Sequence, residues 1–185
     1  MSKSSFPSGY DPQKDRIEIV PSDPQWPGLY ALEKRVLTHA LGYFPGLRIE
    51  HFGSTAVPGL AAKPILDIMV GVASRADWPR LVKPIESLSY VFYGDNTDKD
   101  EMFFVKGMPP YGERRTHHLH VYELEGERWK KELAFRDHLR ANAVDAAKYG
   151  VLKHELAVKF STDREAYTKA KTGFIRAVLE KIPKG

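Results

Sequence analysis

The sequence predicts an α+β domain, in which helices pack on a mixed or antiparallel sheet and a helical segment follows. Short apolar runs typical of strands alternate with longer segments of helical periodicity in the first two thirds of the chain. From Gly126 onward the pattern is helical almost throughout. At 185 residues the chain suits one well-buried core, so we expect a single domain over residues 15–185, with its helical part at 126–182.

The N-terminal quarter predicts a tail, a strand and a helix. Residues 1–14 lack periodicity and are rich in Ser and Pro, which indicates a flexible tail. The alternation in Arg16–Val20 predicts a short strand, and helical spacing predicts a helix over Trp26–Leu41, capped by Ser22 or Asp23. We expect one apolar stripe of this helix to pack on the sheet: Leu29, Leu32, Val36, Leu37 and Ala40.

Two strands around a Gly-Ser turn contain the first candidate functional residue. Strands are expected at Arg48–Phe52 and Ile65–Val72, and between them Gly53 frees the backbone while the hydroxyls that follow cap a short helix. The second strand is apolar except for Asp67. Because a buried carboxylate is costly unless it is paired or binds a metal, Asp67 requires a partner.

The remaining elements are read in the same way. A helix is expected over Ala76–Leu88, with Asp77 as its cap and a kink or an end at Pro84. The polar loop 94–101 resembles a calcium loop only superficially, because its glycine and closing glutamate are out of register, so it is read as a solvated turn. Further strands are expected at Tyr90–Tyr93, Met102–Val105 and His118–Glu123, and further helices at Glu127–Arg140, Val144–Lys159 and Arg164–Lys181, the last capped by Asp163.

Composition excludes several classes of function. The chain has no Cys, so disulfides, thiolate metal sites and cysteine nucleophiles are excluded and any metal must be bound by Asp, Glu or His. The net charge of +4 favours anionic ligands, but the basic residues do not form the tracts of nucleic-acid binders. No apolar run approaches the ~20 residues that span a bilayer, and the first ten residues do not resemble a secretory signal. We therefore expect a cytoplasmic protein without a membrane or nucleic-acid partner.

The histidines of one strand are spaced as metal ligands. His118 and His120 project to one face of their strand and His117 to the other. Neutral imidazoles at this spacing suit a divalent metal, although a surface strand with solvated histidines explains the same pattern. The presence of Asp67 on a neighbouring strand would decide in favour of a metal site.

Several residues are candidates for binding phosphate. The turn Gly53–Thr55 opens a short helix and offers backbone N–H groups to an anion, although the same tripeptide is common as a capped turn. Lys63 and Arg115 either neutralise phosphate or lie in solvent, and no P-loop, GxGxxG or GxSxG motif is present. Charged residues of the C-terminal helices are expected on solvated faces: Arg136, Arg140, Lys153, Arg164 and Lys171.

Taken together, the stretch HFGSTAVPGL at 51–60, followed by AKPILDI at 62–68, resembles the signature of the GrpB family. This family is grouped with the nucleotidyltransferase superfamily, which implies a palm-like sheet, a Gly-Ser turn that grips nucleotide phosphate, and strand carboxylates that bind divalent metal. The similarity covers roughly Ile17–Leu179 and includes further matches at Asp23, Trp26, Pro27, Arg115–Val121, Phe135–Arg140, Tyr167, Thr168, Lys171, Phe174 and Ile175.

The implied site matches the superfamily pattern only in part. Gly53 and Ser54 match its Gly-Ser turn, and Asp67 matches the first carboxylate of its Asp-x-Asp pair. Met69 stands where the second carboxylate belongs, which puts two-metal catalysis in doubt. Either a strand histidine replaces the missing ligand, or the site binds nucleotides without transferring them.

The resulting hypothesis is a nucleotidyltransferase-like protein that binds a nucleotide or another phosphate-bearing small molecule, together with a divalent metal, Mg²⁺ or Mn²⁺ rather than Zn²⁺. The catalytic metal site would consist of Asp67, His118 and His120. The nucleotide would be bound by Gly53, Ser54, Thr55, Lys63 and Arg115. One alternative is a non-catalytic nucleotide- or coenzyme-binding module, since relatives are joined to dephospho-coenzyme A kinase. A further alternative is a metal-dependent hydrolase that uses the same carboxylate and histidines.

Overall fold

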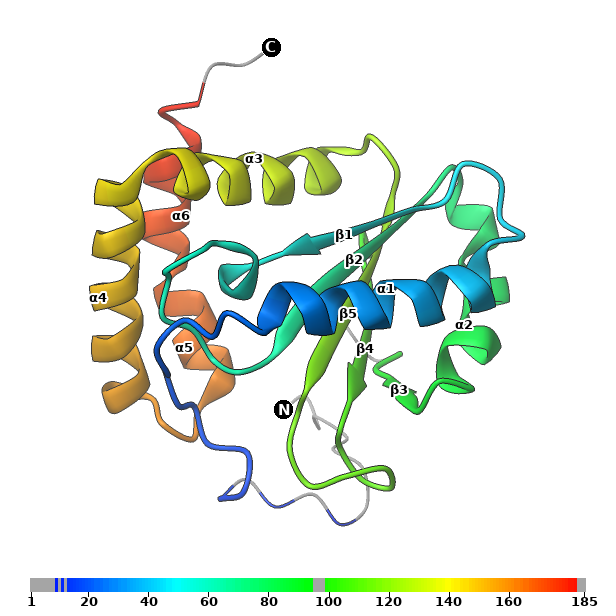
Figure 1. Ribbon diagram of the computed structural model, residues 1–185, viewed down its shortest axis with the longest axis horizontal. Helices are drawn as coiled ribbons and strands as arrows, with labels where there is room; N and C mark the ends of the chain where they lie inside the picture. Colours follow the sequence, from blue (N-terminus) through cyan, green and yellow to red (C-terminus); the bar gives the residue numbers. More distant parts are fainter. Residues whose placement is uncertain (1–8, 10, 12, 95–98, 183–185) are drawn as a thin grey trace.

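The computed structural model describes residues 9, 11, 13–94 and 99–182 and contains a five-stranded sheet in the order β1-β2-β5-β4-β3 (Figure 1). Strands β2 and β5 are parallel, whereas the other neighbouring pairs are antiparallel. The predicted mixed sheet is therefore confirmed. The strands are β1 (Arg48–Phe52), β2 (Leu66–Val72), β3 (Tyr90–Phe92), β4 (Met102–Lys106) and β5 (His117–Glu123).

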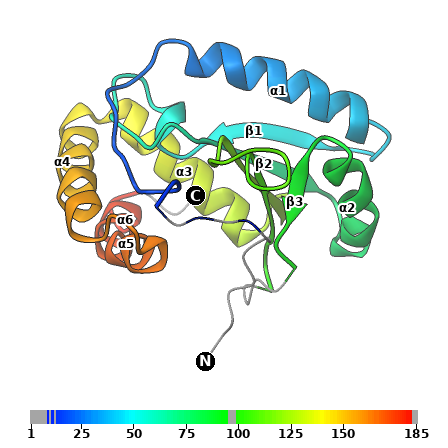
Figure 2. The ribbon, with the colours of Figure 1, turned by 90° about the horizontal axis from the view of Figure 1, so that it is seen from below.

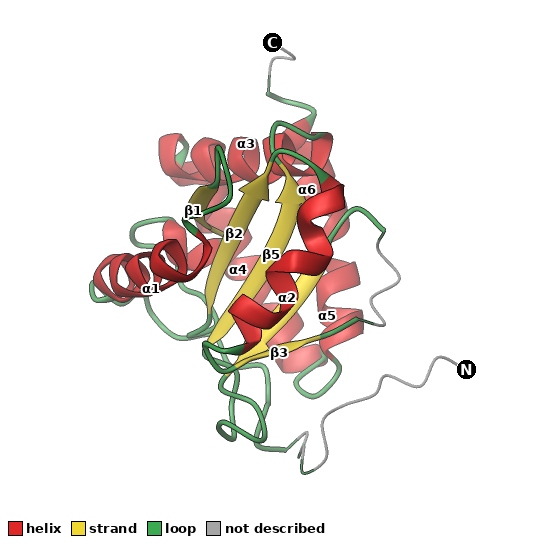
Figure 3. Ribbon diagram, turned by 90° about the vertical axis from the view of Figure 1, so that its right-hand side faces the viewer, coloured by secondary structure: helices red, strands yellow, loops and turns green. Residues whose placement is uncertain are grey.

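Helices cover both faces of this sheet, so the predicted α+β class is also confirmed. Helices α1 (Trp26–Leu41) and α2 (Trp78–Glu86) lie on one face and α3 (Glu127–Ala141) on the other (Figure 2). Figure 3 shows α2 over the sheet, with β2 and β5 side by side behind it. The remaining helices are α4 (Ala143–Lys159), α5 (Arg164–Ala170) and α6 (Thr172–Leu179), with short 3₁₀ turns η1 (Ser54–Ala56) and η2 (Arg75–Asp77). None of the described helices is long and apolar enough to span a bilayer.

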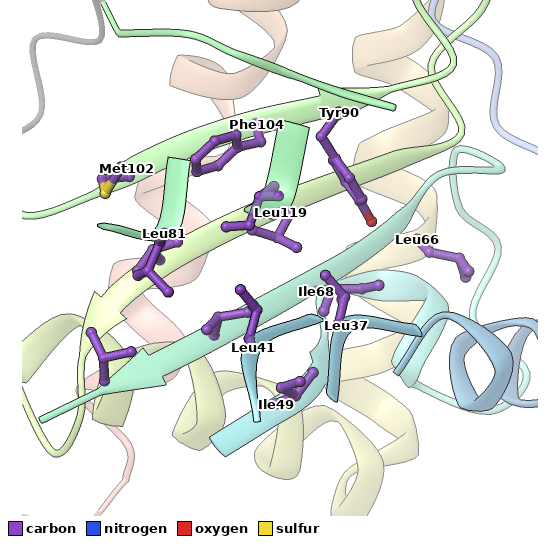
Figure 4. Packing of buried hydrophobic residues seen from close by; sticks show 14 of the residues in the cluster. Leu37, Leu41, Ile49, Leu66, Ile68, Leu81, Tyr90, Met102, Phe104 and Leu119 are labelled. Carbon is purple, nitrogen blue, oxygen red and sulfur yellow. The ribbon is translucent and has the colours of Figure 1, made fainter. Parts of the chain in front are cut away.

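The largest core cluster fills the space between the sheet and helices α1 and α2. Leu37 of α1 and Leu81 of α2 are fully buried against Ile68 of β2 and Leu119 of β5 (Figure 4). Because side chains alternate along a strand, this packing turns Asp67 and the even-numbered histidines of β5 toward the opposite face, which α3 partly covers.

The apolar stripe expected on α1 is wrong in part. Leu29, Leu32 and Val36 are 45%, 52% and 43% exposed, whereas Leu37 is buried. The helix is turned so that Glu33 faces inward, because its carboxylate accepts hydrogen bonds from the Tyr90 hydroxyl at 3.0 Å and the Lys106 ammonium at 2.8 Å. Hydrophobic periodicity could not reveal a buried carboxylate whose partners come from distant strands.

The strand expected at Arg16–Val20 is not formed. Only an isolated bridge joins Val20 to Ala62. Ile17 is instead buried against the C-terminal helices, and its N–H donates to the Ser161 carbonyl at 2.7 Å. The alternation therefore reflects an extended segment that packs on helices. The flexible tail expected at 1–14 and the centre of the loop at 94–101 lie largely outside the described residues.

Helix ends agree with the sequence only in places. Asp163 caps α5 by accepting from the Ala166 N–H, as expected, but the helix predicted over Arg164–Lys181 divides at Lys171. No side chain caps α1. Before α2, Ser74 caps the preceding 3₁₀ turn in place of Asp77, and α2 ends two residues after Pro84.

Candidate metal and nucleotide site

The parallel pairing of β2 and β5 brings the three predicted metal ligands together. In this register Asp67 lies opposite His118, and Met69 lies opposite His120. One potential ligand atom from each of Asp67, His118 and His120 lies within 4.8 Å of the other two. His117 faces the other side of the sheet, where its Nε2 is 3.9 Å from Glu33.

Two carboxylates orient the two imidazoles. Nδ1 of His118 is 3.0 Å from Asp67 Oδ1, and Nδ1 of His120 is 2.5 Å from Glu101 Oε1. Burial lowers the pKa of His118 to about 3 despite Asp67, so this imidazole is neutral at pH 7 and donates its Nδ1–H to the carboxylate. Burial opposes charging of His120 too, but Glu101 raises the pKa of that imidazole above its usual value. Sequence reasoning missed Glu101, which immediately precedes β4.

The residues present fit a divalent cation. Nε2 of His118 is buried and has no hydrogen-bond partner among the described residues, although a neutral imidazole bound through Nδ1–H keeps its lone pair there. Glu101 on Nδ1 of His120 is the usual support for an imidazole ligand. Asp67 is itself a candidate ligand, so a cation shared by Asp67 and His118 would replace the Nδ1 proton that joins them. Two imidazoles and one carboxylate suit Mn²⁺ or Zn²⁺ better than Mg²⁺, which prefers oxygen ligands.

Met69, in the place of the second carboxylate, lies beside His120 of the neighbouring strand. Met69 is fully buried and packs with Phe52, Tyr122 and Trp129. A carboxylate at this position would be buried in apolar surroundings. Because His120 lies opposite Met69 in the parallel register, its imidazole stands beside the place of the absent ligand.

The Gly-Ser turn lies directly against Asp67. Gly53 has φ 67° and ψ −167°, a conformation essentially restricted to glycine. A Cβ at this position would lie 2.4 Å from Asp67 Oδ2, so only glycine allows the approach. Ser54 is half-buried. The hydroxyl of Thr55 is hydrogen-bonded to His51 Nε2 at 2.9 Å, so this hydroxyl already has a partner within the protein.

Three lysines lie close to the Tyr149 and Tyr167 rings of the C-terminal helices. We call Lys63, Lys153 and Lys171 the lysine cluster. Nζ of Lys63 and Nζ of Lys171 lie 5.5 Å and 4.6 Å from the centre of the Tyr167 ring. Nζ of Lys153 lies 4.9 Å from the Tyr149 ring and donates to the Ala61 carbonyl. Lys153 is only 3% exposed and Lys171 is half-buried, so the solvated faces expected for them are wrong.

The lysine cluster and Asp67 belong to one electrostatic site. Burial lowers the pKa of Lys63 and of Lys153 to about 7 and also lowers the pKa of Lys171. The negative charge of Asp67 acts in the opposite direction on all three ammonium groups. The loop from the Gly-Ser turn to Lys63 lies between the sheet and helices α4 and α5 (Figure 1).

Arg115 is anchored beside this site. Its Nε donates to Asp15 Oδ2 at 2.9 Å, and Nε of Arg164 donates to the same oxygen at 2.9 Å. The Arg115 side chain is 8% exposed, so it does not merely solvate its loop. Lys63, Arg115 and Arg164 also line a hollow of ≈ 150 Å³ together with residues of the N-terminal segment.

Comparisons with known proteins show the family to which the chain belongs. A family model described as GrpB protein matches residues 16–181. The chain belongs to the GrpB family. It is 50% identical to the UPF0157 protein PA4798 of Pseudomonas aeruginosa over 166 residues, which are 89% of this chain and 67% of that protein. It is also 29% identical to a dephospho-CoA kinase of Mycolicibacterium paratuberculosis, covering 86% of this chain but 44% of the kinase.

Solved structures extend the likeness to the nucleotidyltransferase-like fold. GrpB from Enterococcus faecalis superposes with a TM-score of 0.78 at 32% identity, over 89% of this chain and 96% of that one. The Cid1 poly(U) polymerase superposes with a TM-score of 0.54 at 10% identity, over 82% of this chain and 49% of that one. At this identity the likeness to Cid1 establishes a shared fold alone.

Proposed function

We propose that this GrpB protein binds a nucleotide and a divalent cation at Asp67, His118 and His120 and transfers the nucleotidyl group to an acceptor. The observation that carries the proposal is the parallel register of β2 and β5, which places one carboxylate and two imidazoles within 4.8 Å. The glycine turn against Asp67 and the likeness to nucleotidyltransferase folds support it.

The roles of the residues follow from their positions. Asp67, His118 and His120 would hold the cation, with Glu101 orienting His120. When bound, a cation of this kind offsets the negative charge of phosphate oxygens. Gly53 lets the turn approach, and Ser54 and Lys63 are assigned to the nucleotide phosphates. An acceptor oxygen would attack the α-phosphorus in line with the bond to pyrophosphate, which then leaves.

Thr55 and Arg115 have more limited roles in this proposal than direct side-chain binding of the nucleotide. Thr55 contributes through its backbone, because its hydroxyl is bound to His51. Arg115 contributes its positive charge from a fixed position, because Asp15 already accepts from its Nε. The two imidazole ligands disfavour Mg²⁺, and Mn²⁺ is the cation chosen for the test because it also accepts the carboxylate oxygen of Asp67.

A non-catalytic nucleotide-binding module is the second candidate, and Met69 favours it. The buried thioether leaves β2 with one carboxylate, so a second cation would have no ligand from that strand. The module would retain the Gly-Ser turn and the single cation centre and would not release pyrophosphate.

Calorimetric titration with Mn²⁺, alone and with each common nucleoside triphosphate, tests the proposal. We expect saturable Mn²⁺ binding by the wild type, its loss in Asp67→Asn, and no change in Asp77→Asn, which replaces a carboxylate on the other side of the sheet. Asparagine can still accept from His118, so the fold should persist. Equal binding by the wild type and Asp67→Asn would overturn the metal site. Pyrophosphate release with Mn²⁺ supports transfer, whereas binding without release selects the module.

A further inference from the structure

The lysine cluster is not explained by the packing of the protein. Buried ammonium groups are usually paired, because burial without a partner costs free energy. Among the described residues, none of the three lysines forms an ion pair with a carboxylate, and only Lys153 forms a hydrogen bond, to the Ala61 carbonyl. Each ammonium group has three donors, so Lys153 keeps two for another partner.

The charges near the cluster leave an excess of positive charge. Asp67 is the carboxylate whose charge reaches all three lysines, and Glu132 reaches Lys171 as well. Asp67 is already hydrogen-bonded to His118, and Arg115 and Arg164 add further positive charge near Lys63. A ligand that satisfies this arrangement carries several negative charges.

We propose that the lysine cluster is a binding site for a polyphosphate group, built jointly by the loop at Lys63 and by helices α4 and α5. The Tyr149 and Tyr167 rings hold the lysine amines in place at 4.6–5.5 Å from their centres, so the donors are positioned before a ligand arrives. This inference deepens the proposed function and rests on it only for the identity of the phosphorylated ligand, a nucleotide. In this arrangement the C-terminal helices contribute Lys153 and Lys171 to the ligand site.

Tripolyphosphate is the probe for the cluster, titrated by calorimetry in EDTA at constant ionic strength. We expect Lys153→Met and Lys171→Met each to weaken binding roughly tenfold or more, because each removes charge-assisted hydrogen bonds. Lys148→Met on α4 and Lys169→Met on α5 are matched controls with exposed lysines, and both should bind as the wild type does. Circular dichroism and thermal unfolding verify that the methionine variants are folded, which is expected since methionine suits a buried position.

Two comparisons identify the source of the phosphates and separate this inference from the metal site. If the cluster variants lose affinity for adenosine triphosphate but not for adenosine monophosphate, the phosphates are those of the nucleotide. If both nucleotides bind unchanged while tripolyphosphate binding falls, the cluster serves a second phosphorylated ligand. Asp67→Asn should retain tripolyphosphate binding even if Mn²⁺ binding is lost. Wild-type affinity in both cluster variants, or no saturable binding by the wild type, would overturn the inference.

Discussion

At the scale of single residues, the site depends on how closely Gly53 approaches Asp67. The backbone of Gly53 lies in a region that other residues rarely adopt, and the space for a Cβ is filled by the Asp67 carboxylate. The turn and the carboxylate are therefore fitted to each other. A side chain at position 53 would have to displace the group that the proposed cation requires.

The variant Gly53→Ala should lose about 1–3 kcal/mol of unfolding free energy from backbone strain alone, and it should also lose Mn²⁺ binding as Asp67 is displaced. Urea denaturation and Mn²⁺ titration measure the two effects. Gly59→Ala is the matched control, because Gly59 also has a positive φ of 77° but no atom within 4 Å of an added Cβ. It should be strained yet bind Mn²⁺ normally. Normal Mn²⁺ binding by Gly53→Ala would mean that the turn does not position Asp67.

The sequence identified the chemistry of single residues better than their partners. Asp67 stands out in the sequence because a carboxylate interrupts an apolar strand, and His118 and His120 stand out because they share a strand face. Glu101 and Lys153 gave no such signal: Glu101 ends a polar loop and Lys153 lies on an amphipathic helix, and the importance of each comes from contacts with distant residues. A glycine motif could indicate a tight turn, but only the structure shows which carboxylate fills the space beside it.

At the scale of elements, strand faces were predictable and strand neighbours were not. Alternation correctly placed His118 and His120 on one face, but the contact with Asp67 joins residues 51 apart in the chain. At Arg16–Val20 the strand prediction itself was wrong. The alternating segment is extended but packs on the C-terminal helices instead of joining the sheet. The apolar stripe predicted for helix α1 is also partly wrong, because the inward face of this helix includes the buried carboxylate of Glu33.

The lysines carried by the helices and the loop predict how ligand binding depends on pH. In the free protein the pKa of Lys63 and of Lys153 is about 7, because burial favours the neutral amine. An anion requires the charged form, so affinity for sulfate, whose charge is constant from pH 6 to 9, should fall as pH rises through about 7. Binding at pH 8 should take up protons, which calorimetry in buffers of different ionisation enthalpy measures. In Lys153→Met the proton uptake should be smaller; uptake equal to the wild type would contradict this assignment.

The same lysines make the stability of the free protein depend on pH in the direction opposite to that of anion affinity. Between about pH 7 and 10.5 the unfolded chain binds protons at these lysines that the folded chain does not. Their contribution to the unfolding free energy of the free protein therefore increases as pH rises through that window. Ligand affinity and intrinsic stability are thus expected to respond to pH in opposite directions.

At the scale of the whole molecule, the extended N-terminal segment joins the sheet region to the C-terminal helices. Asp15 is 4% exposed and accepts hydrogen bonds from Arg115, two residues before β5, and from Arg164, at the start of α5. Two residues later, Ile17 packs against the C-terminal helices. These contacts fix α5, and with it Lys171, relative to the strands that carry Asp67 and His118.

Asp15→Asn should therefore be strongly destabilising, by about 3–5 kcal/mol, because it leaves two largely buried guanidinium groups without their carboxylate. Urea denaturation measures this loss, and hydrogen exchange should show the largest change at the start of α5. Glu113→Gln is the control, because its ion pair with Lys14 is exposed, and it should unfold at the wild-type urea concentration. If Asp15→Asn unfolds with the wild-type midpoint, the C-terminal helices are held by their apolar contacts alone, and the lysine cluster does not depend on the N-terminal segment for its position.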